Sequence, residues 1–292
     1  MIVKMLNKIS RNFCLIFGVF FCANVAAKEC ESQYSSIIID EKNLRIISEN
    51  RAEKYIYPAS LTKVMTLYLV FEALEKKQIS LEQKIKISDY AQDISQVNKV
   101  TTLHLKEGDE ITVEDAIKGS AIKSFNETAL ALAELVGGNE WNFVRMMNEK
   151  AKSLKMLHTN FRNSTGLHED GQYSTIYDLA RLLIATEKKF PQYRKYFGQK
   201  EFVYRDKKYV THNNFLAKYE GASGFKTGFT SKAGFNLMAT AKRGEHSLSA
   251  VIVGCETFMA RDNYAKEIFD YSFDLMSFKD DAEEKIVLNG SF

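Results

Sequence analysis

The sequence predicts an α/β protein of the α+β type, in which both ends of the chain build one antiparallel sheet and a helical section is inserted between them. Two pairs of apolar runs indicate the sheet, because a short polar turn separates the members of each pair. Between the pairs, apolar residues recur every three or four positions, as on the buried face of a helix. The chain has 292 residues, of which 45% are hydrophobic, enough for a sizeable core.

Two hairpins account for the sheet. Near the N-terminal end, residues 36–40 and 44–48 form two apolar-rich runs, and three polar residues separate them. Near the other end, residues 235–241 and 248–254 flank a polar turn. Short apolar runs bounded by polar turns are typical of antiparallel strands, so we expect two hairpins within one sheet.

Helical periodicity marks the section between the hairpins. We expect the helical insertion over about residues 80–200, a final helix over 262–276 and a polar tail over 279–292. Only two prolines and no Gly/Ser-rich linker interrupt residues 28–278, which we therefore assign to one domain. The apolar residues with helical spacing are Leu61, Val64, Met65, Tyr68, Phe71 and Leu74, then Leu130, Leu132, Ala133 and Val136, then Leu179, Leu182 and Leu183.

The first 27 residues are predicted to be a secretory signal. They carry Lys4, Lys8 and Arg11 but no acidic residue, and an apolar run over 13–25 is followed by small residues. We expect cleavage after Ala27 and a periplasmic or secreted protein. The alternative is an uncleaved anchor, although a membrane-spanning helix needs about 20 apolar residues.

Beyond this signal the charges balance, with 37 basic against 37 acidic residues, which predicts no nucleic-acid partner. Acidic residues break the lysine-rich stretch 195–218, which we expect to be a solvated face. The sequence after residue 278 is mainly charged, so we expect no stable membrane insertion once the signal is removed.

Export permits a disulfide between Cys30 and Cys255, but two separate thiols are the simpler expectation.

The sequence predicts neither a cofactor nor a metal ion. Its histidines are scattered without the spacing of metal ligands, so we expect each of them in a loop or on the surface. The lone Trp141 is expected in the core. The histidines are His104, His158, His168, His212 and His246.

A candidate serine nucleophile lies at the start of the apolar helix that follows Pro58. Ser60 and Lys63 are three residues apart, so they share one face of a helix. A serine hydroxyl needs a base to become a nucleophile, and a lysine can serve when burial or a nearby cation lowers its pKa. The positive end of the helix dipole favours an oxyanion at the same place.

Two further motifs follow along the chain. Chance predicts about two Ser-x-x-Lys patterns at this composition, and the chain has three, so that pattern alone is weak. Lys226-Thr227-Gly228 is rarer, with about 0.08 occurrences expected by chance. Ser124-x-Asn126 in the helical section and Lys-Thr-Gly before an apolar strand complete the motif order of penicillin-interacting serine enzymes.

With these motifs the sequence resembles the D-alanyl-D-alanine carboxypeptidases among the low-molecular-mass penicillin-binding proteins, over about residues 34–273. The resemblance implies the penicillin-binding/β-lactamase-like fold, with a helical subdomain inserted into the sheet. One departure is Phe125, which stands where many members have glycine and is expected to reshape the wall of the site. The matching stretches are 58–66, 124–134, 173–175, 178–180, 224–230 and 233–237.

The resemblance also implies the catalytic roles. Ser60 corresponds to the acylated nucleophile and Lys63 to its general base. Ser124 corresponds to the group that relays a proton to the leaving amine. The oxyanion hole is expected to consist of the backbone N–H groups of Ser60 and Phe229.

The substrate-binding roles follow from the same resemblance. Asn126 is expected to hold the substrate amide. Lys226 and Thr227 are expected to bind the terminal carboxylate, with Arg261 as a further cation nearby. Gly228 has no side chain and is expected to let a peptide backbone approach the edge of the strand.

The resemblance predicts a hydrolase that removes the terminal D-alanine from peptidoglycan stem pentapeptides through an acyl-enzyme, with β-lactams as covalent inhibitors. A DD-endopeptidase that cleaves peptidoglycan crosslinks shares these motifs and stays an alternative. A noncatalytic peptidoglycan-binding scaffold is an alternative of another class. A class A β-lactamase is disfavoured, because the sequence contains no Glu-x-x-Leu-Asn.

Overall fold

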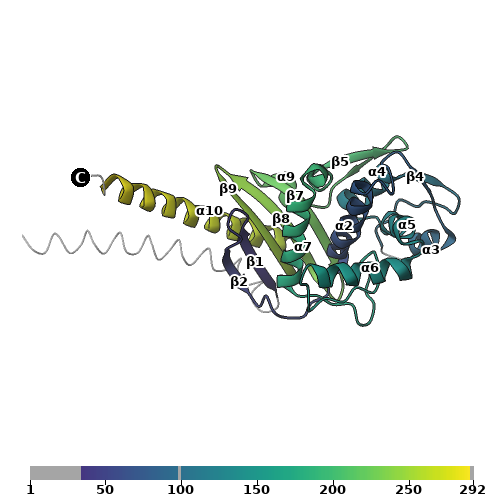
Figure 1. Ribbon diagram of the computed structural model, residues 1–292, viewed down its shortest axis with the longest axis horizontal. Coiled ribbons are helices and arrows are strands. Elements are labelled where there is room, and N and C mark those ends of the chain that lie inside the picture. Colours follow the sequence, from purple (N-terminus) through teal and green to yellow (C-terminus); the bar gives the residue numbers. More distant parts are fainter. Residues whose placement is uncertain (1–33, 98–99, 290–292) are drawn as a thin grey trace, which may run out of the picture.

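Both ends of the chain build one sheet, as predicted, and a fifth strand that we did not predict, residues 222–230, extends it (Figure 1). The computed structural model describes residues 34–97 and 100–289. Its strand order is β2-β1-β9-β8-β7, and every neighbouring pair is antiparallel, which confirms the predicted fold class. The strands are β1 (Ser35–Asp40), β2 (Ile46–Asn50), β7 (Ala222–Thr230), β8 (Gly234–Arg243) and β9 (His246–Cys255).

Helices and two small hairpins form most of the rest of the described chain. The helices are α2 (Thr62–Glu75), α3 (Asp89–Gln96), α4 (Val113–Lys118), α5 (Asn126–Gly137), α6 (Glu140–Ser153), α7 (Ile176–Lys189), α8 (Arg194–Gly198), α9 (Asn214–Lys218) and α10 (Phe258–Asn289). The small hairpins pair β3 (Lys84–Lys86) with β4 (Glu110–Thr112), and β5 (Glu201–Tyr204) with β6 (Lys207–Val210).

Helix α2 is the centre of the helical subdomain. Every residue from Thr62 to Leu74 is buried, including the polar ones. The helix packs against α5, α6 and α7, so it has no face exposed along its length. A helix surrounded in this way holds its side chains in fixed positions, which suits the placement of reactive groups.

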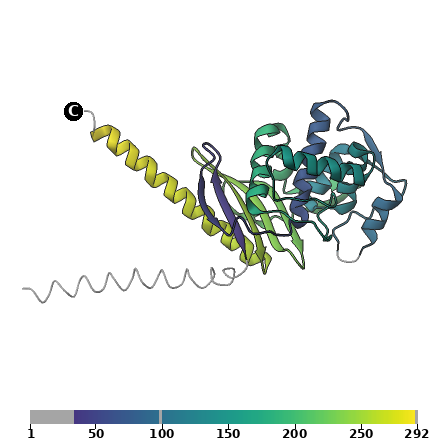
Figure 2. The ribbon, with the colours of Figure 1, turned by 60° about the horizontal axis from the view of Figure 1, so that its bottom comes forward.

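Helices cover both faces of the sheet (Figures 1 and 2). On one face, α7 contacts β1 and β9 and separates the sheet from α2. On the other face, α10 packs on β8 and β9, where Phe269 and Phe273 join a buried cluster with Leu237 and Ile252. Strand β7 is left at one edge, beside the segment that precedes α2.

Helix α10 extends beyond its expected bounds. We expected a helix over 262–276 and a tail after residue 278, but the helix runs from Phe258 to Asn289. The charged stretch 279–284 contains neither glycine nor proline, and its Ala, Glu and Lys residues favour helix. Charge alone therefore does not end the helix.

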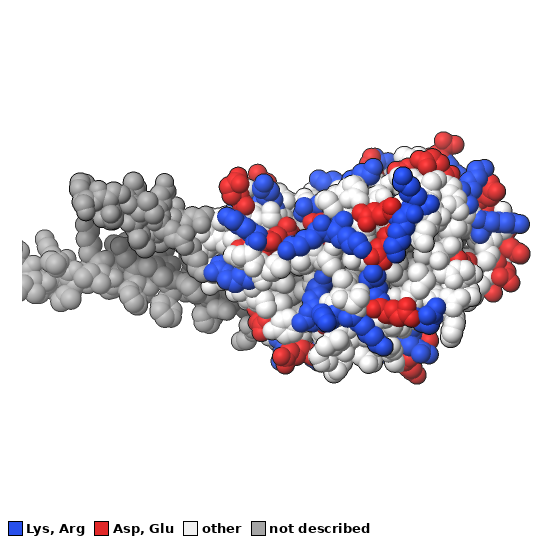
Figure 3. Space-filling model, in the orientation of Figure 1, with Lys and Arg blue, Asp and Glu red and all other residues white. Residues whose placement is uncertain are grey.

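The predictions for residues 1–27 and for Cys30 fall outside the described residues. Within the described ranges, no helix combines the length and the hydrophobicity of a membrane-spanning segment. On the face in Figure 3, basic and acidic side chains are interspersed. Within the lysine-rich stretch, for example, Lys208 pairs with Glu201 at 2.6 Å.

Candidate active site

Ser60 lies in a strained turn immediately before α2. It is the middle residue of a 3₁₀ turn, so it precedes the α-helix in which we expected it. Ala59 has a φ of 49°, a left-handed conformation that costs a residue with a side chain about 1–2 kcal/mol. The buried side-chain amide of Asn236 on β8 donates to the carbonyl oxygens of Tyr57 at 3.2 Å and Pro58 at 3.4 Å. These bonds tie the turn to the sheet.

Two glycines from distant segments pack against this turn. A Cβ on Gly166 would lie 1.9 Å from the carbonyl oxygen of Ala59, and the φ of Gly166 is 83°. A Cβ on Gly228 would lie 3.1 Å from the backbone nitrogen of Ser60. Besides the role toward a substrate backbone that we expected for it, Gly228 thus makes room for the turn that carries Ser60.

Lys63 reaches from the first turn of α2 toward Ser60. Its Nζ lies 3.2 Å from Ser60 Oγ, 2.7 Å from Asn126 Oδ1 and 2.6 Å from the carbonyl oxygen of Thr165. A neutral amine has two N–H bonds and one lone pair. Asn126 and Thr165 can accept the two N–H bonds, which leaves the lone pair for the Ser60 hydroxyl. The geometry therefore suits a base that takes the proton of Ser60.

The surroundings of Lys63 favour its neutral form. Its side chain is fully buried, and this burial lowers its pKa well below the usual value; the charge of Lys226 lowers it further, against a smaller opposite effect of Glu127. Lys226 is buried as well, and burial followed by the charge of Arg261 lowers its pKa to about 7. Near neutral pH, a neutral Lys63 can therefore coexist with a partly protonated Lys226.

Ser124 and Asn126 approach the same place from the helical subdomain. Ser124 ends a wide helical turn with a φ of 64°, and Asn126 is the first residue of α5. The Oγ of Ser124 is buried and has no hydrogen-bond partner among the described residues. Buried hydroxyls are normally engaged, so this oxygen is available to a molecule in the cleft.

The sheet side of the cleft supplies positive charge. Lys226 on β7 donates to the carbonyl oxygen of Thr227 at 2.8 Å. Arg261 on α10 is 3% exposed, and its guanidinium donates to Asp262 Oδ1 at 2.6 and 2.8 Å. A third bond of 3.4 Å runs to the carbonyl oxygen of Asn236, which links Arg261 to the strand that holds the Ser60 turn.

The predicted site residues meet at one cleft of about 810 Å³ between the sheet and the helical subdomain. Lys63 and Lys226 are buried beneath it, and Phe229 is half exposed at its mouth. Among the described side chains, no His, Cys, Asp or Glu residues gather in threes as metal ligands would. The predicted residues that line the cleft are Ser60, Ser124, Asn126, Thr227, Gly228, Phe229 and Arg261.

Phe125 does not form the wall of the site, contrary to our expectation. Its side chain is 2% exposed, and its ring packs edge-on against Phe202 and Tyr209 of the β5–β6 hairpin. The ring therefore anchors this hairpin to the helical subdomain. The cleft is lined by its neighbours Ser124 and Asn126 instead.

His168 and His212 lie in exposed loops, as expected, and both also line the cleft. His212 Nε2 is 2.7 Å from Lys123 Nζ, and desolvation followed by that positive charge lowers the pKa of His212 to about 4. His168 Nε2 is 2.7 Å from Lys232 Nζ. Trp141, which we expected in the core, is instead 75% exposed. No spacing in the sequence marks the two histidines, because the tertiary fold alone brings them to the cleft.

The family model for D-alanyl-D-alanine carboxypeptidases, peptidase type S11, matches residues 23–257. The chain belongs to this carboxypeptidase family. D-alanyl-D-alanine carboxypeptidase DacF of Bacillus subtilis is 36% identical over 245 residues, which cover 82% of this chain and 61% of that protein. This chain thus spans about three fifths of the length of that relative and of DacC of Escherichia coli.

Solved structures of the family share the fold. Penicillin-binding protein 5 from Haemophilus influenzae is 30% identical with a TM-score of 0.79, over 82% of this chain and 70% of that one. Penicillin-binding protein D2 from Listeria monocytogenes, in its cefotaxime-bound form, is 25% identical with a TM-score of 0.73, over 82% of this chain and 96% of that one. The penicillin-binding fold inferred from the motifs is therefore confirmed.

Gly166→Ala should disrupt the Ser60 turn. Its new Cβ would overlap the Ala59 carbonyl, so we expect acylation by a fluorescent penicillin to slow about 100-fold and the free energy of unfolding to fall by about 2–4 kcal/mol. Gly171→Ala is the matched control: it lies in the same loop with a φ of 81°, but its nearest neighbour would be 3.9 Å from the Cβ. Gly171→Ala should lower the free energy of unfolding by only about 1 kcal/mol. Equal effects of the two substitutions would contradict the packing argument.

The two buried lysines should make the protein more stable as the pH rises from 7 to 9. In this window the unfolded chain keeps protons on Lys63 and Lys226 that the folded state has lost, so the free energy of unfolding increases with pH. Lys226 alone should contribute about 1 kcal/mol per pH unit. Urea titrations at several pH values measure this slope. Lys226→Met should reduce this slope, whereas Lys208→Met, a substitution of an exposed lysine, should not. An unchanged slope in Lys226→Met would refute the lowered pKa of Lys226.

Proposed function

We propose that this protein is a serine D-Ala-D-Ala carboxypeptidase that removes the terminal D-alanine from peptidoglycan stem pentapeptides. The observation that carries the proposal is the buried Lys63 amine, 3.2 Å from Ser60 Oγ, with its other two contacts made by acceptors. The cleft beside this pair ends in the buried cations Lys226 and Arg261. A nucleophile, a base and a carboxylate-binding end are the parts that hydrolysis next to a free C-terminus requires.

Acylation begins at Ser60. Neutral Lys63 takes the hydroxyl proton while Oγ attacks the carbonyl carbon of the penultimate D-alanine. The oxyanion is stabilised by the backbone N–H groups of Ser60 and Phe229. As the C–N bond breaks, the leaving amine of the terminal D-alanine receives the proton from Lys63, relayed by the Ser124 hydroxyl. Water then hydrolyses the ester, which restores free Ser60.

Substrate binding uses the sheet side of the cleft. The terminal carboxylate binds near Lys226, Thr227 and Arg261, and this new anion favours the protonated form of Lys226. Asn126 holds the substrate amide while its Oδ1 accepts from Lys63. A peptide backbone runs along the edge of β7, because an edge strand offers unpaired N–H and C=O groups. Gly228 keeps that edge free of side-chain atoms.

The relatives support this substrate class. DacF and DacC are both named D-alanyl-D-alanine carboxypeptidases, and the Listeria protein binds cefotaxime in its crystal structure. A β-lactam presents a strained amide to the same serine, and its amine stays tethered after the ring opens. Ser60 should therefore remain acylated by such drugs for a long time.

We place the protein outside the cytoplasm, in the periplasm or secreted. Residues 1–27 have the pattern of a secretory signal, and peptidoglycan is assembled outside the cell membrane.

We keep residues 28–278 as one catalytic domain. Crosslink cleavage by a DD-endopeptidase and binding without catalysis remain the alternatives that the experiments below distinguish.

A fluorescent penicillin should label the mature protein covalently with a stoichiometry near one. Ser60→Ala should abolish the adduct, because Ser60 Oγ is the hydroxyl that is hydrogen-bonded to Lys63 Nζ. The control is Ser120→Ala, which removes a buried serine of another Ser-x-x-Lys pattern whose hydroxyl is hydrogen-bonded to Thr128. Unlabelled wild type, or equal labelling of Ser60→Ala, would refute the proposal, and rapid turnover of the drug would indicate a β-lactamase.

Purified muropeptides should distinguish the two peptidase activities. We expect release of D-alanine from pentapeptide monomers, because Lys226 and Arg261 provide the charge that a free terminal carboxylate needs. Chromatography with mass detection follows both reactions. Conversion of crosslinked dimers to monomers without release of D-alanine would support the endopeptidase. No reaction with either substrate, combined with full rescue of deletion-mutant cells by Ser60→Ala, would support the scaffold.

A further inference from the structure

One side of the turn over residues 163–167 contacts the catalytic centre. On that side, the carbonyl oxygen of Thr165 accepts from Lys63 Nζ at 2.6 Å, and the carbonyl oxygen of Ser164 accepts from Thr66 Oγ1 at 2.6 Å. Both partners lie on the first turns of α2. The position of this turn therefore helps to decide where the Lys63 amine sits.

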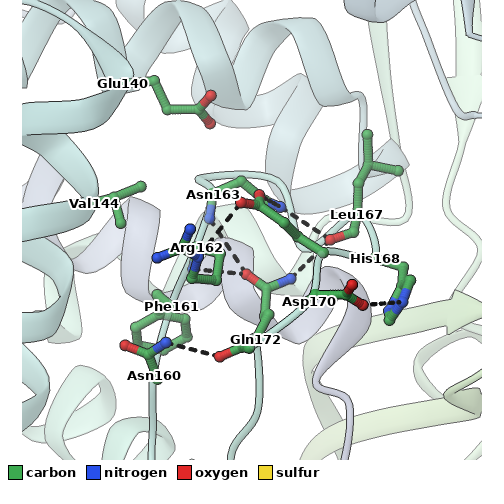
Figure 4. A network of polar contacts seen from close by, with 12 residues as sticks. Glu140, Val144, Asn160, Phe161, Arg162, Asn163, Leu167, His168, Asp170 and Gln172 are labelled. Carbon is green, nitrogen blue, oxygen red and sulfur yellow. Dashed lines mark hydrogen bonds and ion pairs between the residues drawn. The ribbon is translucent and has the colours of Figure 1, made fainter.

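Bonds inside the loop fix the shape of this turn (Figure 4). The Asn163 side chain accepts from the Gly166 N–H at 2.7 Å and donates to the Leu167 carbonyl at 3.0 Å. Gln172 also donates to the Leu167 carbonyl, at 2.8 Å, and accepts from the backbone N–H groups at the start of the turn. These partners all belong to the same loop, so they move with it. Contacts from other elements must set its distance from α2.

Glu140 provides such a contact from the opposite side. It is the first residue of α6 and borders a second hollow of about 610 Å³, which Phe161 and Arg162 also line just before the turn. Its Oε1 accepts from the Ser164 N–H at 2.8 Å and from the Ser164 hydroxyl at 2.6 Å. Ser164 is fully buried, so water cannot take the place of this carboxylate oxygen as the acceptor for the two Ser164 donors.

Tyr90 on α3 holds the carboxylate in turn. Its hydroxyl donates to Glu140 Oε2 at 2.9 Å, and burial followed by the charge of Glu140 raises the pKa of Tyr90 to about 12. The hydroxyl thus stays protonated and remains a donor throughout the neutral range. Glu140 is therefore fixed from α3 and α6, two elements that do not belong to the loop.

We propose that Glu140 is a positioning residue for catalysis: by bonding to Ser164, it holds the Thr165 carbonyl at the distance that orients the Lys63 amine toward Ser60. The inference rests on the proposed function, because it assigns Lys63 as the base. Glu140 itself touches neither Ser60 nor Lys63. Removing its carboxylate should release the turn toward the hollow and misdirect the lone pair of Lys63, while the rest of the cleft keeps its substrate contacts.

The test separates acylation from binding and from folding. Stopped-flow labelling with a fluorescent penicillin gives the acylation rate constant and the dissociation constant of the preceding complex, and the final stoichiometry counts folded enzyme. Glu140→Ala should lower the acylation rate constant about tenfold or more, with little change in that dissociation constant or in stoichiometry. Glu140→Gln keeps an oxygen that can accept from both Ser164 donors, so it should stay within about threefold of wild type.

Glu134→Ala is the matched control. Glu134 borders the same hollow, but it accepts from Ser88 and makes no bond to the turn, so acylation should stay near the wild-type rate. The inference would be overturned if Glu140→Ala were acylated at the wild-type rate. It would also be overturned if the acylation rate constant of Glu140→Gln fell as much as that of Glu140→Ala. A lower stoichiometry with an unchanged rate constant would show a folding role only and would overturn it as well.

A second variant keeps the inference testable if Glu140→Ala does not fold. Ser164→Ala removes the 2.6 Å hydroxyl bond and keeps the backbone bond to Glu140. It should slow acylation about threefold to tenfold, and an unchanged rate would overturn the inference. Failure of the wild type to become labelled would instead refute the proposed function, so the two failures are distinguishable.

Discussion

The burial of the Lys63 amine is the constraint on which the site depends. In water this amine would be protonated at neutral pH and useless as a base. Inside α2 it is surrounded by protein, and its contacts are the Asn126 side chain, the Thr165 carbonyl and Ser60 Oγ. Burial lowers the pKa, the two acceptors orient the lone pair, and Lys226 adds a second positive charge that disfavours protonation.

This burial explains the architecture around α2. A helix that carries a reactive lysine on a fully covered surface needs neighbours on every side, and α5, α6 and α7 provide them. The sheet then closes the remaining side with β7, whose Gly228 lies against the Ser60 turn. The left-handed Ala59 is held there by Asn236 from β8 and by close packing with Gly166. Backbone strain of this kind persists only where the surroundings determine it.

The two ends of the cleft have opposite electrostatic tasks. At Lys63, positive charge must be suppressed, whereas at Lys226 and Arg261 it must be available to a carboxylate. The same burial lowers the pKa of Lys226 to about 7, so part of its charge is present only when an anion is near or the pH is low. Lys226 comes from β7 and Arg261 from α10, which packs on the sheet, whereas the base comes from α2. One cleft can therefore hold both kinds of group.

The sequence by itself determined the two hairpins that form β1, β2, β8 and β9, the helices α2, α5, α7 and α10, and the candidate catalytic residues. It did not identify β7, the two small hairpins or the other helices of the helical section. Hairpins and amphipathic helices depend on neighbours a few residues away, and the Ser-x-x-Lys, Ser-x-Asn and Lys-Thr-Gly motifs are local as well. Only the tertiary structure decided how Gly166, Asn236 and Glu140 support the Ser60–Lys63 pair, and that Phe125 anchors a hairpin instead of lining the cleft. These roles depend on distances between segments that are far apart in the chain, and no local pattern records such distances.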